Sequence, residues 1–422
     1  MASFQPVRAA GRHGRSALFL LLPALAACGD GPADPDPGAA ALRPGAVPPT
    51  EDLSTLDDLA HLGYVDYAEP DSEGASGVVL RDPARADGGY TLVTSLTTAS
   101  AALVDAAGRE VRTWSEGAGP EARWARVRLL ANGDLLCVSP RPDALTRLGF
   151  DGTRLWRLPI EAHHDGIELP DGRLLVLTRA FRTLPAVDPA RRSVDNHLTF
   201  VSADGRVLEE RSLYDLLAAE PRQLVVRRPA GLEELPPGYD LDPIHANTLF
   251  WLAQPLPPGA HPEFRPGRLL VTLRYLDAVA LLDLEQGRCV WSFGPGLLEG
   301  PHDASVLPDG RVLVLDNGWD ARGWSRVVEY DPVQERVTWE YRAEVPERFH
   351  TSGRGTVQRL PEGNVLVGNS NSGEAFEVTR EGRLVWRYLN PRTDPAGARA
   401  VVRVERYPAA RIEPLLARFP DR

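Results

Sequence analysis

Apolar and polar residues alternate along most of this chain, in short runs that end at Gly, Asp, Asn or Pro. Alternation of this kind is typical of half-buried β-strands separated by turns. Helical spacing of apolar residues is found around residues 53–64, LSTLDDLAHLGY, and almost disappears after them. The pattern therefore predicts a short helical segment within residues 51–74, followed by an all-β domain.

The strand pattern is repeated along the chain. Each unit has an apolar strand, a PDG or NG turn, a strand rich in Leu and Val, a third strand, a second turn and a last strand that ends in Trp. Six such units, each of about 40–50 residues, predict a six-bladed β-propeller over residues 75–410. GVVL, residues 77–80, is expected to be the first strand of the first blade. AVVRVERY near residue 400 is expected to help close the ring, and residues 411–422 are expected to form a C-terminal tail.

Two further features follow from the repeat. An aromatic residue at one place in the last strand of a unit indicates packing between blades, and we assign no chemistry to the five that share it, Trp114, Trp156, Trp291, Trp339 and Trp386. Residues 214–241 are rich in Pro and charge and interrupt the third and fourth units. They predict a long loop between two blades, and long loops often act as lids or binding edges.

The N-terminus has the pattern of a bacterial secretory signal. Arginines at positions 8, 12 and 15 precede the apolar run ALFLLLPALAA, which is too short to be a stable membrane span. LAAC, residues 25–28, resembles the lipobox at which a lipid is attached to a cysteine. We therefore expect residues 1–27 to be a lipoprotein signal peptide and Cys28 to carry the lipid. An ordinary signal peptide cut near Ala27 is the alternative.

Residues 28–50 are rich in Pro, Ala and Gly, a composition that cannot bury a core and is typical of an extended tether. Together with a lipid on Cys28, this tether predicts a protein anchored to a membrane in the cell envelope and facing the periplasm or the exterior.

Composition excludes several kinds of function. The net charge of −11 argues against a nucleic-acid partner, which would require a basic face. All 47 basic residues are arginines, so no lysine nucleophile, Schiff base or phosphate-loop lysine is possible. Cys137 and Cys289 lie in separate apolar strand-like runs, which favours buried thiols over a disulfide or a metal pair.

Three histidines occupy a position that the repeat does not require. His164 and His302 each lie eight residues before the glycine of a PDG turn, and each is followed by an aspartate. His245 begins the first strand of the fourth unit and is followed by Ala and Asn247. Because the first strands of a propeller line its central channel in the same direction, these histidines are expected to meet at one mouth of the channel, with His163 beside them.

Arg274, at the end of the second strand of the fourth unit, is expected near the same mouth, and Arg179 has the analogous place in the third unit. A surface ion pair is the alternative for both arginines. Neutral imidazole can act as a nucleophile, a general base or a metal ligand, and the arginine fork matches tetrahedral oxyanions. The residues themselves therefore predict the transfer of an anionic group, or a metal centre.

Four motifs in one order carry a resemblance to a known family. HHD with LPDG, then IHANT, then LLVTLR, then HDASVLPDGRVLVLDNG resemble the motif set of bacterial arylsulfate sulfotransferases, over most of residues 75–410. The resemblance implies a six-bladed propeller that moves a sulfuryl group from a phenolic sulfate ester to a phenol acceptor. It also implies a sulfohistidine intermediate, no cofactor, no metal and no nucleotide sulfate donor.

The resemblance also implies roles for single residues. His302 is expected to be the nucleophile, because its context matches the catalytic segment of the family. His164 or His163, His245 and Arg274 are expected to bind the sulfuryl oxygens and to handle the phenolic proton. Further substrate contacts are expected from Asn247, Asp303 and Asn317.

The resemblance leaves the role of Asp303 open, and the chain differs from some members of the family in its N-terminal region. Asp303 either orients the ring of His302 or forms the turn at the start of the strand. Enterobacterial members of the family carry an N-terminal β domain associated with dimerisation, whereas only residues 51–74 separate the tether from the propeller in this chain. Dimerisation through such a domain is therefore not expected.

Two other functions fit the same pattern. One is a metal-dependent hydrolase on the same propeller, with histidines and aspartates at the channel mouth as ligands, namely His163, His164, His245, His302, Asp165 and Asp303. The other is a non-catalytic envelope lipoprotein that serves as a scaffold or a ligand-binding module, because a fold alone does not fix an activity.

Overall fold

A computed structural model describes the greater part of the chain after residue 74, namely residues 75–95, 98–117, 122–140, 143–228, 240–319, 321–392, 399 and 403–420. The predicted signal peptide, Cys28, the tether and the helix at residues 53–64 lie outside these residues. No helix within the described ranges is both long and apolar enough to cross a bilayer.

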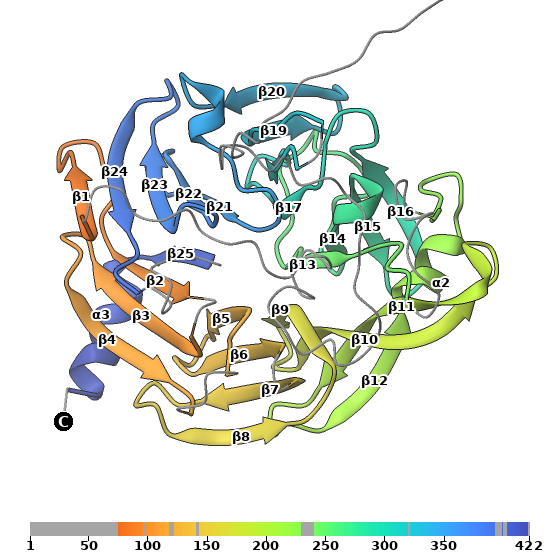
Figure 1. Cartoon of the computed structure of the whole chain (residues 1–422), viewed down its shortest axis with the longest axis horizontal. Coiled ribbons are helices and arrows are strands. Elements are labelled where there is room, and N and C mark those ends of the chain that lie inside the picture. The colour runs from red at the N-terminus through yellow and green to blue at the C-terminus, as the bar shows by residue number, and fades with distance from the viewer. Residues whose placement is uncertain are drawn as a thin grey trace, which may run out of the picture. The chain divides into compact units, whose positions relative to one another are not determined.

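The described residues form six antiparallel sheets, arranged as blades around a central axis (Figure 1). In blades two to five the chain runs in sequence order from the innermost strand outward. The PDG turns contain Gly172 and Gly310, whose φ angles of 83° and 88° favour glycine over residues with a Cβ. The structure therefore confirms the prediction of a six-bladed β-propeller.

The first three blades have the following strands, from the innermost outward. Blade one consists of β25 (Arg403–Tyr407), β2 (Tyr90–Ser95), β3 (Ser100–Asp105) and β4 (Glu110–Ser115). Blade two consists of β5 (Arg126–Leu129), β6 (Leu135–Pro140), β7 (Asp143–Leu148) and β8 (Arg154–Leu158). Blade three consists of β9 (Ala162–Glu168), β10 (Leu174–Leu184), β11 (Asp188–Val201) and β12 (Val207–Ser212).

The other three blades follow the same order. Blade four consists of β13 (Ala246–Trp251), β14 (Leu269–Leu273), β15 (Ala278–Asp283) and β16 (Arg288–Phe293). Blade five consists of β17 (His302–Val306), β18 (Val312–Asp316), β19 (Arg326–Asp331) and β20 (Arg336–Tyr341). Blade six consists of β21 (Thr356–Arg359), β22 (Val365–Asn369), β23 (Glu374–Val378), β24 (Leu384–Leu389) and, outermost, β1 (Gly77–Arg81).

The ring is closed by a strand from the C-terminal part of the chain. β25 pairs with β2 and becomes the innermost strand of blade one, so AVVRVERY contributes to closure as expected. GVVL was expected in that place, and this expectation is wrong, because β1 pairs with the outer strand β24 of blade six. Both segments are apolar and strand-like, and only the pairing partners distinguish an inner from an outer position.

The hydrophobic core is divided among the interfaces between blades. Apolar side chains of the described residues form six buried clusters, and each cluster lies between two neighbouring blades. Each sheet is therefore buried on both faces, which explains strands such as β22 whose side chains are all buried. Cys137 and Cys289 are buried free thiols in this core, as expected.

The repeated tryptophans join one blade to the next. Their indole Nε1 atoms donate to a backbone carbonyl in a turn of the following blade, at 2.8–3.2 Å, in Trp114, Trp156, Trp339 and Trp386. Trp291 instead packs against Phe264, Phe293 and Tyr330. The five residues therefore have the structural role that the repeat predicts.

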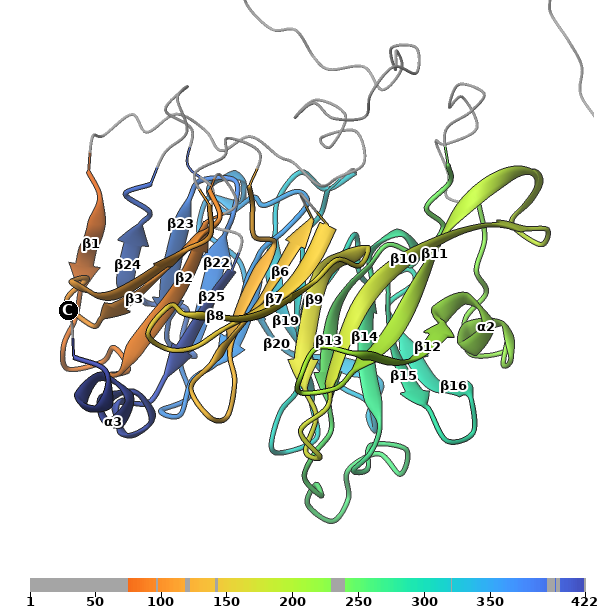
Figure 2. The same cartoon turned by 90° about the horizontal axis from the view of Figure 1, so that it is seen from below.

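Few elements lie outside the blades. Helix α2 (Leu213–Ala218) is capped by the Ser212 side chain, which accepts from the Asp215 backbone N–H, and two 3₁₀ turns are η1 (Arg274–Leu276) and η2 (Pro346–Arg348). Residues expected as a tail belong largely to helix α3 (Ala409–Arg418), which buries Ile412 against blades one and two. Figure 2 shows β10 and β11 as a long hairpin that extends beyond the neighbouring strands.

Candidate active site

The innermost strands of blades three, four and five are irregular at the position of the histidines. Strand pairing shifts register there in each blade, between Val176 and Thr178, between Ala246 and Thr248 and between His302 and Ser305. Such β-bulges redirect side chains and are common beside active sites.

Three residues at these bulges have a left-handed backbone conformation. The φ angles are 56° at His164, 50° at His245 and 52° at Asp303. For residues with a Cβ this conformation costs about 1–3 kcal/mol, and it persists where the surroundings enforce it. In blades three and four the strained residue is the histidine that the sequence analysis identified. In blade five it is Asp303, the residue after His302.

The structure brings the histidines of the repeat position together. The ring centroids of His164 and His245 are 4.9 Å apart. The ring of His302 lies close enough to both for their charges to affect one another's protonation. We call His164, His245, His302 and Arg274 the histidine cluster.

His163 lies behind this cluster. Its Nε2 atom donates to the carbonyl of Thr178 at 3.2 Å, which leaves Nδ1 of the neutral ring as an acceptor. His164 Nδ1 is 2.7 Å from that atom and therefore donates to it. This pair of hydrogen bonds leaves the lone pair of His164 on Nε2, so His163 positions His164 while His164 itself contacts His245.

His302 is held in one tautomer by two oxygen atoms. Its Nδ1 lies 2.9 Å from Asn317 Oδ1 and 3.1 Å from the carbonyl of Gly300, and both oxygens accept. The amide of Asn317 cannot turn round, because its Nδ2 donates to the carbonyls of Thr351 and Arg354. Nδ1 of His302 therefore carries the proton, and the lone pair is on Nε2.

The Nε2 atom of His302 is buried and has no hydrogen-bond partner among the described residues. Burial lowers the pKa of His302 to about 3, and the charge of Arg274 acts in the same direction. The imidazole is therefore neutral at physiological pH. A neutral ring with an available lone pair is the state that a histidine nucleophile requires.

His245 forms a pair with a buried carboxylate that the sequence analysis did not identify. Its Nδ1 donates to Asp242 Oδ2 at 2.7 Å, and its backbone N–H donates to Asp242 Oδ1 at 2.8 Å. A carboxylate in this place fixes the tautomer and stabilises the protonated ring when one forms. The signal in the sequence was Asp242 itself, three residues before His245 in DPIHANT.

Arg274 begins the 3₁₀ turn η1 and is buried, with its backbone N–H donating to the carbonyl of His245 at 3.1 Å. Its guanidinium lies against the rings of Tyr275 and Trp319 and donates to the carbonyl of Ser352 at 3.4 Å. Arg179 differs, because it forms ion pairs with Asp143 and Glu161. The ion-pair alternative therefore holds for Arg179, whereas Arg274 belongs to the histidine cluster.

Two residues of the HANT motif hold the backbone on either side of His302. Asn247 Nδ2 donates to the carbonyl of Pro301 at 2.9 Å, and Thr248 Oγ1 accepts from the Asp303 backbone N–H at 3.1 Å. Thr248 also donates to Asn247 Oδ1 at 3.0 Å. Asn247 and Asn317, which we expected to contact substrate, are thus engaged with the segment that carries His302.

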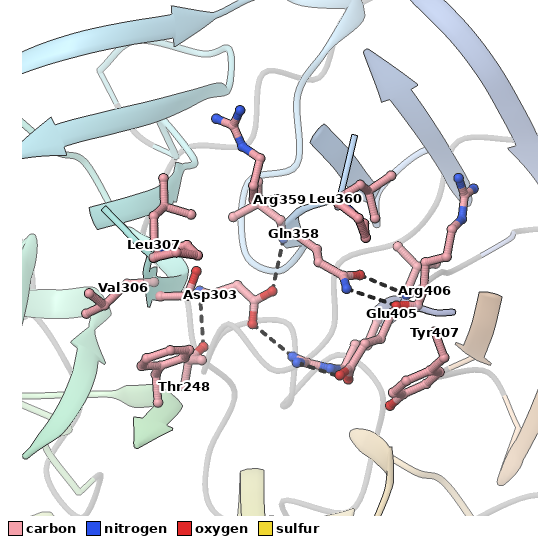
Figure 3. A pocket seen from close by; sticks show the side chains of 18 of the residues that line it. Thr248, Asp303, Val306, Leu307, Gln358, Arg359, Leu360, Glu405, Arg406 and Tyr407 are labelled. Atoms are coloured by element: carbon pink, nitrogen blue, oxygen red, sulfur yellow. Dashed lines mark hydrogen bonds and ion pairs between the residues drawn. The ribbon is translucent and has the colours of Figure 1, made fainter. Parts of the chain in front are cut away.

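Asp303 does not orient the ring of His302. Its Oδ1 binds Arg126 at 3.0 Å and Arg403 at 2.8 Å, and its Oδ2 accepts from the Val357 backbone N–H at 2.9 Å. Figure 3 shows this carboxylate with its hydrogen bonds on either side. The side chain is therefore directed to the channel interior, and the orienting role belongs to Asn317.

Asp165 has the same arrangement in blade three. It binds Arg126 at 2.9 Å and Arg128 at 2.9–3.0 Å, and it accepts from the Leu249 backbone N–H. We call this set of channel-lining charges the arginine–aspartate network, formed by Arg126, Arg128, Arg403, Asp165 and Asp303. Its members come from the innermost strands of blades one, two, three and five.

A cavity of about 610 Å³ begins at this network. Asp303 and the residues that follow it in β17 line the cavity, together with residues of β21 and β25, as Figure 3 shows. No member of the histidine cluster is among its lining residues. The cavity and the histidine cluster are therefore separate features of the channel.

The described residues contain no group of three His, Cys, Asp or Glu side chains placed to hold a metal ion. Asp165 and Asp303, which were candidate ligands, both bind arginines instead. The structure therefore offers no ligand set for the metal-dependent alternative within the part of the chain that it describes.

The fold and the site define a six-bladed β-propeller with a buried cluster of histidines and one arginine. The model of the arylsulfotransferase (ASST) family matches residues 152–391, and the chain belongs to this family. The match includes every member of the histidine cluster. It supports arylsulfotransferase activity in general and confirms the resemblance seen in the sequence motifs.

Other comparisons concern similarity of structure. A protein of unknown function from Bacteroides caccae is 16% identical, with 75% of this chain and 98% of that chain covered and a TM-score of 0.46. Virginiamycin B lyase from Staphylococcus aureus is 11% identical, with 78% and 88% covered and a TM-score of 0.43. No curated protein sequence matches this chain.

Proposed function

We propose that this protein transfers a sulfuryl group from a phenolic sulfate ester to a phenol acceptor, through a sulfohistidine at His302 and without a nucleotide donor. The observation that carries the proposal is the state of the His302 ring. Two acceptors on Nδ1 place the lone pair on a buried Nε2 that has no partner among the described residues. Family membership supplies the kind of group that is transferred.

In the first half of the reaction, Nε2 of His302 attacks sulfur and the bond from sulfur to the phenolic oxygen breaks. The leaving group departs as a phenolate with the electron pair of that bond and takes a proton from water. His302 becomes an N-sulfo imidazolium, because Nδ1 keeps its hydrogen. Asn317 Oδ1 and the Gly300 carbonyl stabilise this positive ring, since both accept from Nδ1.

The rest of the cluster supports charge and proton movement. Arg274 offers a planar donor fork to the sulfuryl oxygens, whose charge must be balanced during transfer. His245 keeps its ring hydrogen on Nδ1 against Asp242, so its Nε2 is suited to take the proton of the acceptor phenol in the second half and to release it to water afterwards. In the second half the acceptor oxygen attacks sulfur, the bond to Nε2 breaks, and His302 returns to its neutral state.

The test is the mass of the intact protein after brief exposure to 4-nitrophenyl sulfate. We expect one added sulfuryl group, located on His302 by peptide mapping, and its loss when phenol is added. The His302→Asn variant should gain no sulfuryl group and should lose turnover by a factor on the order of 10⁴ or more. His261→Asn, a histidine outside the cluster, should keep both.

The proposal fails if the His302→Asn variant retains wild-type turnover, or if the adduct forms on another residue.

Attachment to a membrane through Cys28 stays a prediction, because that residue lies outside the described residues. We propose this envelope location from the signal pattern, the lipobox and the tether, and substitution of Cys28 by Ser should release the protein from membranes.

A further inference from the structure

Two aromatic side chains adjoin the histidine cluster. The Arg274 guanidinium carbon is 5.3 Å from the ring centroid of Tyr275 and 5.4 Å from that of Trp319. The two rings are 6.3 Å apart and tilted by 58°. Tyr275 also lies 4.7 Å from the ring of His245. The Arg274 guanidinium, which the proposed reaction uses to bind the sulfuryl oxygens, is therefore flanked by two aromatic rings.

Trp319 is tied to the segment that holds His302. It follows the Asn317–Gly318 turn, and Asn317 accepts from His302 Nδ1. Its indole packs so closely on Gly300 that a Cβ at that glycine would collide with it. The carbonyl of Gly300 is the second acceptor of His302 Nδ1. Trp319 therefore adjoins both of the groups that fix the nucleophile, one along the chain and one by packing.

Trp319 also differs from the tryptophans of the repeat. It is 39% exposed, whereas Trp386 in the outer strand of blade six is 1% exposed. An exposed indole leaves apolar surface in contact with water, and no blade interface requires one in this turn. Sites for small molecules are lined mainly by apolar and aromatic side chains around a few polar groups, which is the combination that Trp319 and Arg274 offer.

We propose that Trp319, with Tyr275 as a second wall, is the platform on which the aromatic ring of the phenolic substrates stacks. The inference rests on the proposed function and names the part of the site that recognises the ring. In an aryl sulfate the anionic group is bonded directly to the ring. Arg274 between the two aromatic walls matches that combination, because the sulfuryl oxygens and the ring would be held side by side.

Ground-state binding to the inactive His302→Asn variant isolates this role from the chemistry. We expect the further change Trp319→Ala to weaken binding of phenyl sulfate about tenfold, the loss of one aromatic stack. Binding of methyl sulfate, which has the anionic group and no ring, should change less than about twofold. Trp319→Phe should keep most of the affinity, because it retains an aromatic face.

The same substitutions in the active enzyme give an independent measurement. Trp319→Ala should raise KM for 4-nitrophenyl sulfate about tenfold and change kcat much less, because stacking acts before and during transfer alike. The matched control is Phe181→Ala, another exposed aromatic that lies against an arginine, Arg192, on the β10–β11 hairpin. This variant should leave KM unchanged.

Equal losses for phenyl sulfate and methyl sulfate in the Trp319→Ala variant would overturn the inference, because they would show a structural effect on the anion site. Unchanged binding of both would overturn it too. The sulfuryl adduct on wild-type His302 is measured in parallel. If the adduct forms while Trp319→Ala has no selective effect, the platform is wrong and the reaction stands. If no adduct forms, the proposed function fails and the platform falls with it.

Discussion

His302 and Asp303 are neighbours in the chain, yet they belong to two regions of opposite character. In the histidine cluster, Nε2 of His302 has no partner among the described residues, and two histidines have a strained backbone. In the arginine–aspartate network, Asp303 binds two arginines and one backbone N–H. The same division separates His164 from Asp165 in blade three.

The difference shows how a repeat can support a reactive site. Asp165 and Asp303 accept hydrogen bonds from backbone groups of neighbouring blades, namely Leu249 and Val357. These bonds fix the bulges in which the histidines lie. We infer that the ion-paired network offsets the strain and burial that the cluster imposes, and that the two regions respond differently to substitution.

The largest expected effect on stability comes from Asp303→Asn. The substitution removes the charge that Arg126 and Arg403 share, and leaves both arginines buried with too little negative charge. Loss of one partner of a buried ion pair costs about 3–5 kcal/mol of unfolding free energy. Urea unfolding at neutral pH would measure this loss.

The matched control for that experiment is Asp309→Asn in the exposed turn of the same blade. Asp309 binds Arg311, and its side chain is 48% exposed. Exposed pairs contribute about 1 kcal/mol or less. Equal changes in the unfolding midpoints of the two variants would remove the distinction between the network and an ordinary surface pair.

The histidine cluster should instead affect how the unfolding free energy depends on pH. Burial lowers the pKa of His163 and of His302 to about 3 in the folded protein, against about 6.5 in an unfolded chain. Below about pH 6.5 the unfolded chain therefore binds protons that the folded protein does not bind, and the unfolding free energy falls as pH decreases. Each such histidine contributes a slope of about 1.4 kcal/mol per pH unit.

His302→Asn removes one of these groups, so the fall in unfolding free energy between about pH 6 and pH 4.5 should become shallower by about that amount per pH unit. Denaturant unfolding at several pH values measures the slope directly. Asp309→Asn should keep the wild-type slope. A wild-type slope in the His302→Asn variant would mean that His302 is protonated in the folded protein.

The sequence predicted the repeat well, because a propeller blade is determined by residues that are close together in the chain, namely alternating strand residues and PDG turns. It also placed His164, His245 and His302 in one slot. It could not distinguish the direction of adjacent side chains, because the bulges that separate His302 from Asp303 depend on pairing with other strands of the blade. The assignment of GVVL to the first blade failed for a similar reason, since its partner lies at the other end of the chain.

Residues that act through the backbone were the hardest to recognise. Asn247 and Asn317 stood out in motifs and were expected to contact substrate, but their amides bind protein carbonyls near His302. Asp242 lies in a segment that reads as a loop, and Thr248 as an ordinary strand residue. Their roles follow from distances between blades, which composition and spacing do not contain.

The smallest effect that still separates the two regions is expected at Thr248, which contacts both. Its hydroxyl accepts from the Asp303 N–H and donates to Asn247, whose amide holds the Pro301 carbonyl. Thr248→Val keeps the volume but leaves that N–H buried without an acceptor, at a cost of about 1–2 kcal/mol. Because His302 lies between the two anchored groups, turnover should fall as well, while Thr248→Ser restores both. If Thr248→Val loses stability but keeps full turnover, Thr248 supports the arginine–aspartate network and does not position His302.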